Sequence, residues 1–103
     1  MTCRVTVADP PTVVRLAVRG LVDETDVAAI EAAVDVSLAD GRRVVVDVAD
    51  VTTPSVPLLR SLARIAALPH ARGRVEVAGA DVTTRQFLRL RGLDGVLAAE
   101  PPG

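Results

Sequence analysis

Three hydroxyl side chains, Thr52, Thr53 and Ser55, lie together in the least regular segment of the chain. A hydroxyl in such a segment can accept a phosphate, which adds about −1.5 to −2 charges to a protein surface. Ser55 also suits a structural role, because Ser is a preferred N-cap and Pro57, two residues later, fits the first turn of a helix. We therefore expect Ser55 to cap a helix, with phosphorylation of one of the three hydroxyls as the alternative.

Two carboxylates, Asp23 and Asp47, are the other candidates for chemistry. Each stands near the end of an expected strand, and a β-α-β unit can bring such groups close enough for acid–base work. No nucleophile, base or metal ligand accompanies them, and His70 lacks partners at the spacing of a metal site or a catalytic triad. Asp23 can instead support a helix terminus, and Asp47 can bond to loop amides. The residues thus predict no catalytic site, no metal and no cofactor, and we do not expect an enzyme.

The overall charge is nearly balanced, since twelve arginines and no lysines stand against thirteen acids, for a formal net charge of −1. This balance gives no long-range attraction to nucleic acid or to an anionic membrane. Phe87 is the sole aromatic residue, so no platform for stacking bases is expected. No apolar run approaches the roughly eighteen residues of a membrane span. Cys3 is the only cysteine, which excludes an intramolecular disulfide and fits a cytoplasmic protein.

The elements that must position these residues begin with a hairpin. Residues 4–7 and 13–19 alternate polar and apolar side chains, which is typical of half-buried strands. From residue 26 to residue 39 apolar side chains recur at helical spacing. Asp23 or Thr25 can cap the start of this helix. The pattern predicts two strands joined by a proline-containing turn, followed by a helix.

The rest of the chain alternates strands and helices. We expect a strand at 44–48, a helix at 58–68, a strand at 75–77, a helix from 81 that Gly92 ends, and a last short strand at 96–98. The continuous β-branched run at 44–48 indicates a central strand buried on both faces. The order predicts one α/β domain over residues 1–103, with a frayed tail at about 100–103. Its sheet is mostly parallel, has four to five strands, starts with a hairpin and carries about three helices.

Four stretches carry a resemblance to a known family. They are Gly-Leu-Val-Asp at 20–23, the run with its turn at 44–52, Leu-Leu-Arg-Ser-Leu at 58–62, and Arg-Leu-Arg-Gly-Leu-Asp at 89–94. In this order they resemble the start of the first helix, the central strand, the second helix and the third helix of the STAS family. That family comprises sulfate-transporter and anti-sigma-factor-antagonist domains. The resemblance implies the fold described above and a bacterial protein-binding module that acts in transcription regulation and signalling.

The family's phosphorylation loop is degenerate in this sequence. In the family it usually reads Asp-Ser-Ser-Gly, and a partner that is both kinase and anti-sigma factor phosphorylates one serine and then releases the domain. Here Ser55 falls on the Asp, Val56 and Pro57 fall on the two serines, and Leu58 falls on the Gly. Leu21 also replaces the acid of the family's Gly-Glu-Leu-Asp motif. The resemblance therefore implies a binding surface without the usual serine switch.

The partner implied by the resemblance is an anti-sigma factor or related regulator, and a homodimer is also open. The residues expected to contact the partner are Asp23, Thr53, Ser55, Val56, Pro57, Leu58 and Leu59. Two alternatives stay open. Some stand-alone STAS proteins are accessory subunits of ABC-type phospholipid transporters, and others sense a small molecule, which would require an apolar pocket.

Arginines on the later helices form one further candidate surface. They are Arg60, Arg64, Arg85, Arg89 and Arg91. Arg60 and Arg64 are four residues apart and share a helix face. The set is either a partner-contact patch or ordinary solvated helix surface.

Overall fold

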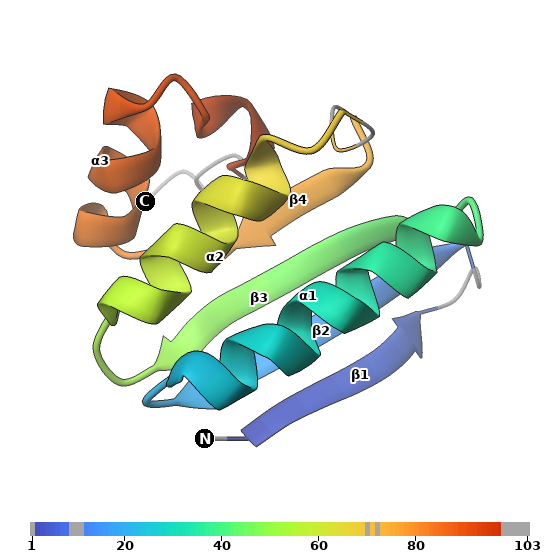
Figure 1. Cartoon of the computed structure of the whole chain (residues 1–103), viewed down its shortest axis with the longest axis horizontal. Helices are drawn as coiled ribbons and strands as arrows, with labels where there is room; N and C mark the ends of the chain where they lie inside the picture. The colour runs from blue at the N-terminus through green and yellow to red at the C-terminus, as the bar shows by residue number, and fades with distance from the viewer. Residues whose placement is uncertain (1, 9–11, 70, 72, 98–103) are drawn as a thin grey trace.

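The computed structural model describes residues 2–8, 12–69, 71 and 73–97, with side chains described from residue 12 onward. Its elements follow the predicted order (Figure 1). They are β1 (Thr2–Ala8), β2 (Val13–Gly20), α1 (Glu24–Ala39), β3 (Arg43–Val51), α2 (Val56–Ala66), β4 (Val75–Ala78), α3 (Val82–Leu90) and a 3₁₀ turn, η1 (Asp94–Val96).

The strands form one four-stranded sheet in the order β1-β2-β3-β4. β1 and β2 make an antiparallel hairpin, whereas β2, β3 and β4 run parallel. The predicted α/β fold, with a mostly parallel sheet that begins with a hairpin, is therefore confirmed. Parallel strands place their carboxyl ends at one edge of the sheet, so the segments that lead into α1, α2 and α3 start from the same edge (Figure 1).

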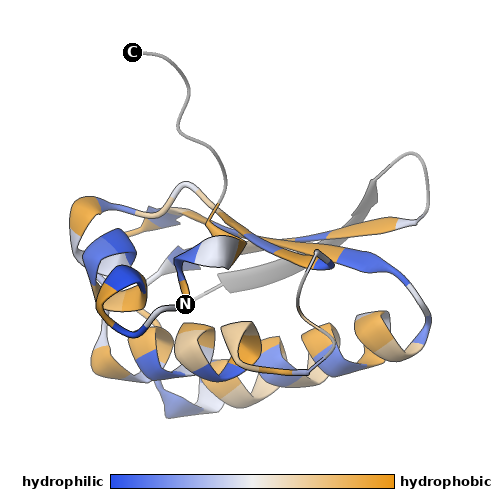
Figure 2. Ribbon diagram, turned by 90° about the horizontal axis from the view of Figure 1, so that it is seen from above, coloured by the Kyte–Doolittle hydropathy of each residue, from blue (hydrophilic) through white to orange (hydrophobic). Residues whose placement is uncertain are grey.

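The core lies between the sheet and the helices. Figure 2 views the sheet along its edge and shows α1 and α2 together on one face, while α3 packs against α2. Alternate residues of β2 and β3 are buried and meet apolar side chains from the helices. These core residues include Leu16, Val18, Val44 and Val46 from the strands and Ile30, Val34, Leu58, Leu62 and Ile65 from α1 and α2. Burial of such aliphatic side chains stabilises the fold by roughly 1.5–3 kcal/mol each.

The prediction that the central strand is buried on both faces was wrong. In β3 the side chains of Val44, Val46 and Val48 are buried, but Val45 and Asp47 between them are only half-buried. The reason is that the helices leave the second face of the sheet uncovered over the part of the chain that the structure describes (Figure 2). The strand is also longer than expected, so Asp47 lies inside β3 rather than at its end.

The last predicted strand is reduced to one bridge. η1 occupies residues 94–96, and only Leu97 pairs, in a parallel bridge with Val77. The Leu97 N–H donates to Asp94 O at 3.0 Å and closes the 3₁₀ turn, which removes that donor from any ladder. Ala98 lies outside the described residues.

The carboxyl end of α1 receives a cap from a distant residue. α1 has no basic residue in its last turn, but the Arg74 Nη2 donates to Leu38 O at 2.7 Å and to Arg42 O at 3.1 Å. A guanidinium at this end gives the last carbonyls an additional donor and complements the helix dipole. Arg74 therefore ties the start of β4 to the α1–β3 turn.

Some expectations fall on residues outside the description. His70 and the tail from residue 98 are not described, and of Cys3 only the backbone, in β1, is described. Among the helices described, none is long and apolar enough to cross a membrane.

Candidate partner-binding edge

Two loops meet at the carboxyl ends of β2 and β3. Residues 21–23 lead from β2 into α1, and residues 52–55 lead from β3 into α2. We call these two segments the loop pair. The sheet register places Gly20 opposite Val51, and the Thr52 N–H donates to Gly20 O at 3.0 Å. The two loops therefore leave the sheet side by side.

Ser55 joins the two loops through its hydroxyl. The Ser55 Oγ donates to Val22 O at 2.6 Å and accepts from the Leu58 N–H at 3.3 Å. The second contact makes Ser55 the N-cap of α2, with a proline in the first turn, so the predicted capping role is confirmed. The first contact crosses 33 residues of sequence and fixes the start of α2 against the start of α1.

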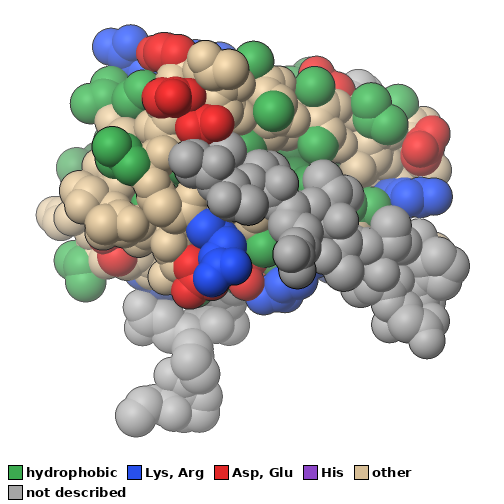
Figure 3. Space-filling view, turned by 90° about the horizontal axis from the view of Figure 1, so that it is seen from below, with side chains coloured by type: hydrophobic (Ala, Val, Ile, Leu, Met, Phe, Trp, Pro, Cys, Tyr) green, Lys and Arg blue, Asp and Glu red, His purple; other side chains and the backbone are tan. Residues whose placement is uncertain are grey.

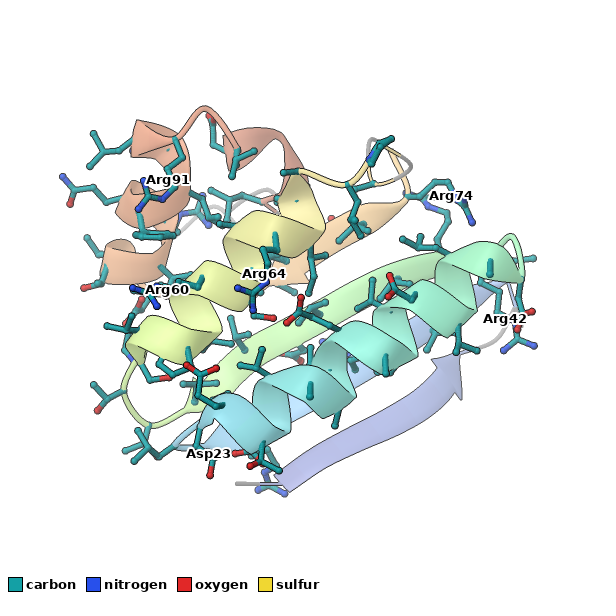
Figure 4. All side chains as sticks on the ribbon, in the orientation of Figure 1. Asp23, Arg42, Arg60, Arg64, Arg74 and Arg91 are labelled. Carbon is teal, nitrogen blue, oxygen red and sulfur yellow. The ribbon has the colours of Figure 1, made fainter. Side chains whose placement is uncertain are left out.

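Asp23 caps α1, which decides between the two predicted caps. The Asp23 Oδ1 accepts from the Asp26 N–H at 2.9 Å, and the Asp26 Oδ2 accepts from the Asp23 N–H at 3.0 Å. This reciprocal pair is a capping box, which satisfies two backbone donors at once. The backbone N–H of Asp26 holds the pKa of Asp23 below its ordinary value. Asp23 thus remains an exposed, ionised group at the end of the first loop (Figure 4).

Apolar side chains are exposed in the first loop and at the start of α2. Leu21 is 63% exposed and Val56 is 59% exposed, and they are the chain neighbours of the bonded residues Val22 and Ser55. The sequence analysis did not single out Leu21 as a surface residue, although an apolar side chain where the family has an acid was the available signal. Leu21 and Val56 are two of the five large apolar side chains that are exposed among the described residues, and exposed apolar side chains that gather in one place can mark a protein interface.

The other predicted contact residues divide between surface and core. Thr52 and Thr53 are exposed, and Pro57 and Leu59 are half-buried. Leu58 is 1% exposed and packs in the core. Leu58 therefore anchors α2 beneath the loop pair, and its side chain is not offered to a partner.

Asp23 and Asp47 serve separate parts of the fold. Asp47 lies opposite Ala17, four residues before β3 ends. Its carboxylate accepts from the Ala49 N–H at 3.0 Å and forms an ion pair with Arg15. Partial burial acts to raise the pKa of Asp47, but the Ala49 N–H and the Arg15 guanidinium outweigh it and lower that pKa. The two acids therefore hold different partners in the structure.

The arginines of the later helices have individual roles (Figure 4). The Arg64 Nε and Nη2 donate to the two carboxylate oxygens of Glu31 at 3.0 and 2.9 Å, which ties α2 to α1. The Arg91 guanidinium lies 4.1 Å from the centroid of the Phe87 ring. Arg60 is exposed at the start of α2. The five arginines are therefore not one uniform patch, because Arg64 and Arg91 already serve the fold.

One open hollow lies away from the loop pair. It has a volume of about 360 Å³ and is lined by Val14, Ala32, Ala33, Val36, Ser37, Asp40 and Arg42. None of the predicted contact residues lines it. Figure 3 shows hydrophobic and acidic side chains interspersed over α1, whose described surface includes Val36, 63% exposed. Within the described residues, no group of three His, Cys, Asp or Glu side chains gathers as metal ligands would.

Comparison with known proteins places these features in a family. A family model described as "Mlab, STAS domain" matches residues 5–98. The match spans both loops of the pair and all three helices. No curated protein matches the sequence.

Proposed function

The chain belongs to the STAS domain family, and we propose that it is a protein-binding module that engages its partner through the loop pair and the start of α2. STAS domains are generally binding modules rather than enzymes, and they typically mediate contacts between proteins. The observation that carries the proposal is the exposed apolar pair, Leu21 on the first loop and Val56 at the start of α2, on two segments that the Ser55–Val22 hydrogen bond ties together.

The proposed module works without a serine switch. Val56 and Pro57 occupy the positions of the family's two serines, so neither can accept a phosphate. The hydroxyl of Ser55 is engaged twice, as donor to Val22 O and as acceptor from the Leu58 N–H. A phosphate on this half-buried oxygen would remove both bonds and place about −1.5 to −2 charges against a backbone carbonyl. Phosphorylation of Ser55 would therefore disrupt the fold as well as the contact.

The leading partner is an anti-sigma factor or related regulator in the cytoplasm, as the resemblance implies. The domain would occupy the partner's surface continuously, because its usual release signal is missing. A second candidate is the accessory subunit of an ABC-type phospholipid transporter. The same missing switch favours it, since a permanent subunit needs no release.

A titration with purified partners tests both candidates. Anti-sigma factors and transporter ATPase subunits encoded in the same genome are titrated against the wild-type chain and the Val56→Asp and Leu21→Asp variants. We expect one partner class to bind the wild type and each variant to weaken its Kd about tenfold or more, since a desolvated apolar anchor contributes over 1 kcal/mol. Val36→Asp is the matched control, because Val36 is as exposed as Leu21 but lies on α1.

The proposal fails if no candidate of either class binds. It also fails if Val36→Asp weakens binding as much as Val56→Asp does. Mass spectrometry of the chain from its host tests the missing switch separately, and phosphate on Thr52, Thr53 or Ser55 would contradict it.

A further inference from the structure

α3 packs one face against the rest of the domain and leaves large apolar side chains exposed on the opposite face. Thr84 and Leu88 are buried on the inner side, and Phe87 packs against the core. On the outer side Val82 is 78% exposed and Leu90 is 81% exposed, the two highest values among the exposed large apolar side chains that the structure describes. Folding gains nothing from exposing them.

The outer residues form one row. Val82, Gln86 and Leu90 are separated by four residues each, and Arg89 stands beside them, so all four share a helix face. We call these four residues the α3 strip. Together with Arg85 they line a shallow hollow of about 340 Å³. Val82 begins α3 at the carboxyl end of β4, so the strip starts at the edge that carries the loop pair (Figure 1).

The strip carries positive charge without a negative one. α3 contains no acid between Val82 and Leu90. The Asp81 carboxylate at its start is engaged as the N-cap, accepting from the Thr84 N–H at 2.8 Å. Among the described side chains Arg89 has no ion-pair partner, and it is exposed. A carboxylate from another molecule would complement it.

We propose that the α3 strip is a second docking surface, which binds an acidic amphipathic segment of a partner protein. Apolar side chains of that segment cover Val82 and Leu90, and a carboxylate between them pairs with Arg89. Charge complementarity sets the sign of the partner's charge, because the strip offers a guanidinium beside Leu90 at the carboxyl end of an otherwise apolar and neutral row. A nine-residue helix with two exposed apolar side chains is too small for stable binding to a lipid surface.

This surface extends the proposed module from one contact to two. A partner that reaches both would cover the loop pair and run along α3. Alternatively, two partners would each take one surface, and the chain would join them. The inference depends on α3 alone and stands even if the loop pair binds nothing.

Site-specific photocrosslinking in the host tests the strip. A photoreactive amino acid replaces Gln86 in the full chain, and a second chain carries it at Glu76, an exposed residue of β4 outside the strip. Crosslinked peptides are identified by mass spectrometry. We expect the Gln86 chain to capture a segment with apolar residues flanking Asp or Glu. Adding Arg89→Glu should reduce the yield at least several-fold, and reversing the partner's carboxylate to Lys should restore it.

The matched control is Arg43→Glu, an exposed arginine at the opposite end of the strands, which should leave the yield unchanged. Thermal melting checks that each variant is folded. The proposal is overturned if the Gln86 chain captures nothing, a second copy of itself, a phospholipid or a basic segment. Equal capture by the Glu76 chain, or no rescue by the reversed carboxylate, also overturns it. Failure of the proposed function is read from the titration of Val56→Asp, whereas failure of this inference is read from the Gln86 crosslink and its loss in Arg89→Glu.

Discussion

At the scale of single residues, the two serines at Ser55 and Ser61 show how differently one hydroxyl can act. Ser55 bonds to Val22 O and to the Leu58 N–H, and so connects two loops. Ser61 lies further along α2, is fully buried and has no hydrogen-bond partner of ordinary geometry among the described residues. The Ser61 hydroxyl also acts to lower the pKa of Glu31, but less than the Arg64 guanidinium does. The Ser55 hydroxyl therefore connects the two loops. The Ser61 hydroxyl is removed from water without gaining a well-formed hydrogen bond, which costs stability.

This contrast gives a prediction for Ser→Ala substitutions. We expect Ser55→Ala to lower the free energy of unfolding by about 1–3 kcal/mol, because it removes an N-cap and leaves Val22 O without its donor. Ser61→Ala should change the free energy by less than about 0.5 kcal/mol or raise it, since it removes no well-formed bond. Urea denaturation at neutral pH measures both. Equal losses in the two variants would show that burial alone, and not the loop connection, decides the effect.

Residue roles were predictable from the sequence only where they are local. The caps by Ser55 and Asp23 follow from residue type and position, because their acceptors serve backbone donors three residues away. The Ser55–Val22 bond and the Arg74 cap on α1 span more than thirty residues, and no local pattern encodes them. Leu58 was expected to contact the partner because of the family resemblance, yet its position on the inner face of α2 turns its side chain into the core.

At the scale of elements, the close approach of two strand ends sets where α3 begins. Gly79 follows β4 with φ at +72°, and a Cβ there would lie 2.6–2.9 Å from the atoms of Ala49 in β3, backbone included. Only glycine fits, because the contact is with backbone and the dihedral is left-handed. The turn after Gly79 then leads directly to Asp81 and the first residue of the α3 strip.

Two glycine substitutions test this approach. Gly73 has nearly the same dihedral, φ +75°, but a Cβ added there would meet nothing within 4 Å. Gly73→Ala should therefore cost about 1 kcal/mol for the left-handed backbone alone. Gly79→Ala adds the clash and should cost at least about 2 kcal/mol more, as overpacking does. Thermal melting of both variants measures the difference, and similar melting temperatures would contradict the role given to Ala49.

Element order was predictable because hydrophobic periodicity changes from two to helical spacing along the chain. One error concerns the burial of a strand, and the other concerns the type of a short segment. The run of β-branched residues in β3 suggested cover on both faces, but the helices α1 and α2 lie on one face (Figure 2). The short apolar segment at 96–98 suggested a strand, but the bond from the Leu97 N–H to Asp94 O closes a 3₁₀ turn instead.

At the scale of the whole molecule, the exposed apolar side chains are unevenly placed. Leu21, Val56 and Val82 each lie at or just before the start of a helix that follows a parallel strand. The carboxyl edge of the sheet therefore carries three of the five exposed large apolar side chains that the structure describes. The fold itself was predictable from the sequence, but this alignment was not, because it depends on three separate helices starting at one edge. The common position of these three helix starts gathers exposed apolar surface at one end of the domain.

Acid should destabilise the molecule through its paired carboxylates. The pKa of Glu31 is lowered chiefly by the hydrogen bonds from Arg64, and those of Asp23 and Asp47 are lowered as well. A carboxyl group whose pKa is lower in the folded state binds fewer protons there than in the unfolded chain. Its contribution to stability is therefore fully present above the ordinary pKa values of 4.5 for Glu and 3.8 for Asp. That contribution disappears as the pH falls through the lower folded values.

We therefore expect the free energy of unfolding to be flat from pH 7 to about 5 and to fall as the pH drops below roughly 4.5. Arg64→Met should make this fall shallower, because Glu31 would then titrate closer to its ordinary value in the folded state. Arg60→Met is the matched control on the same helix, since Arg60 is exposed and has no ion-pair partner among the described residues. Urea midpoints between pH 7 and pH 3 measure all three chains. If Arg64→Met and Arg60→Met follow the same pH profile, the pair that joins α1 to α2 is not a source of acid sensitivity.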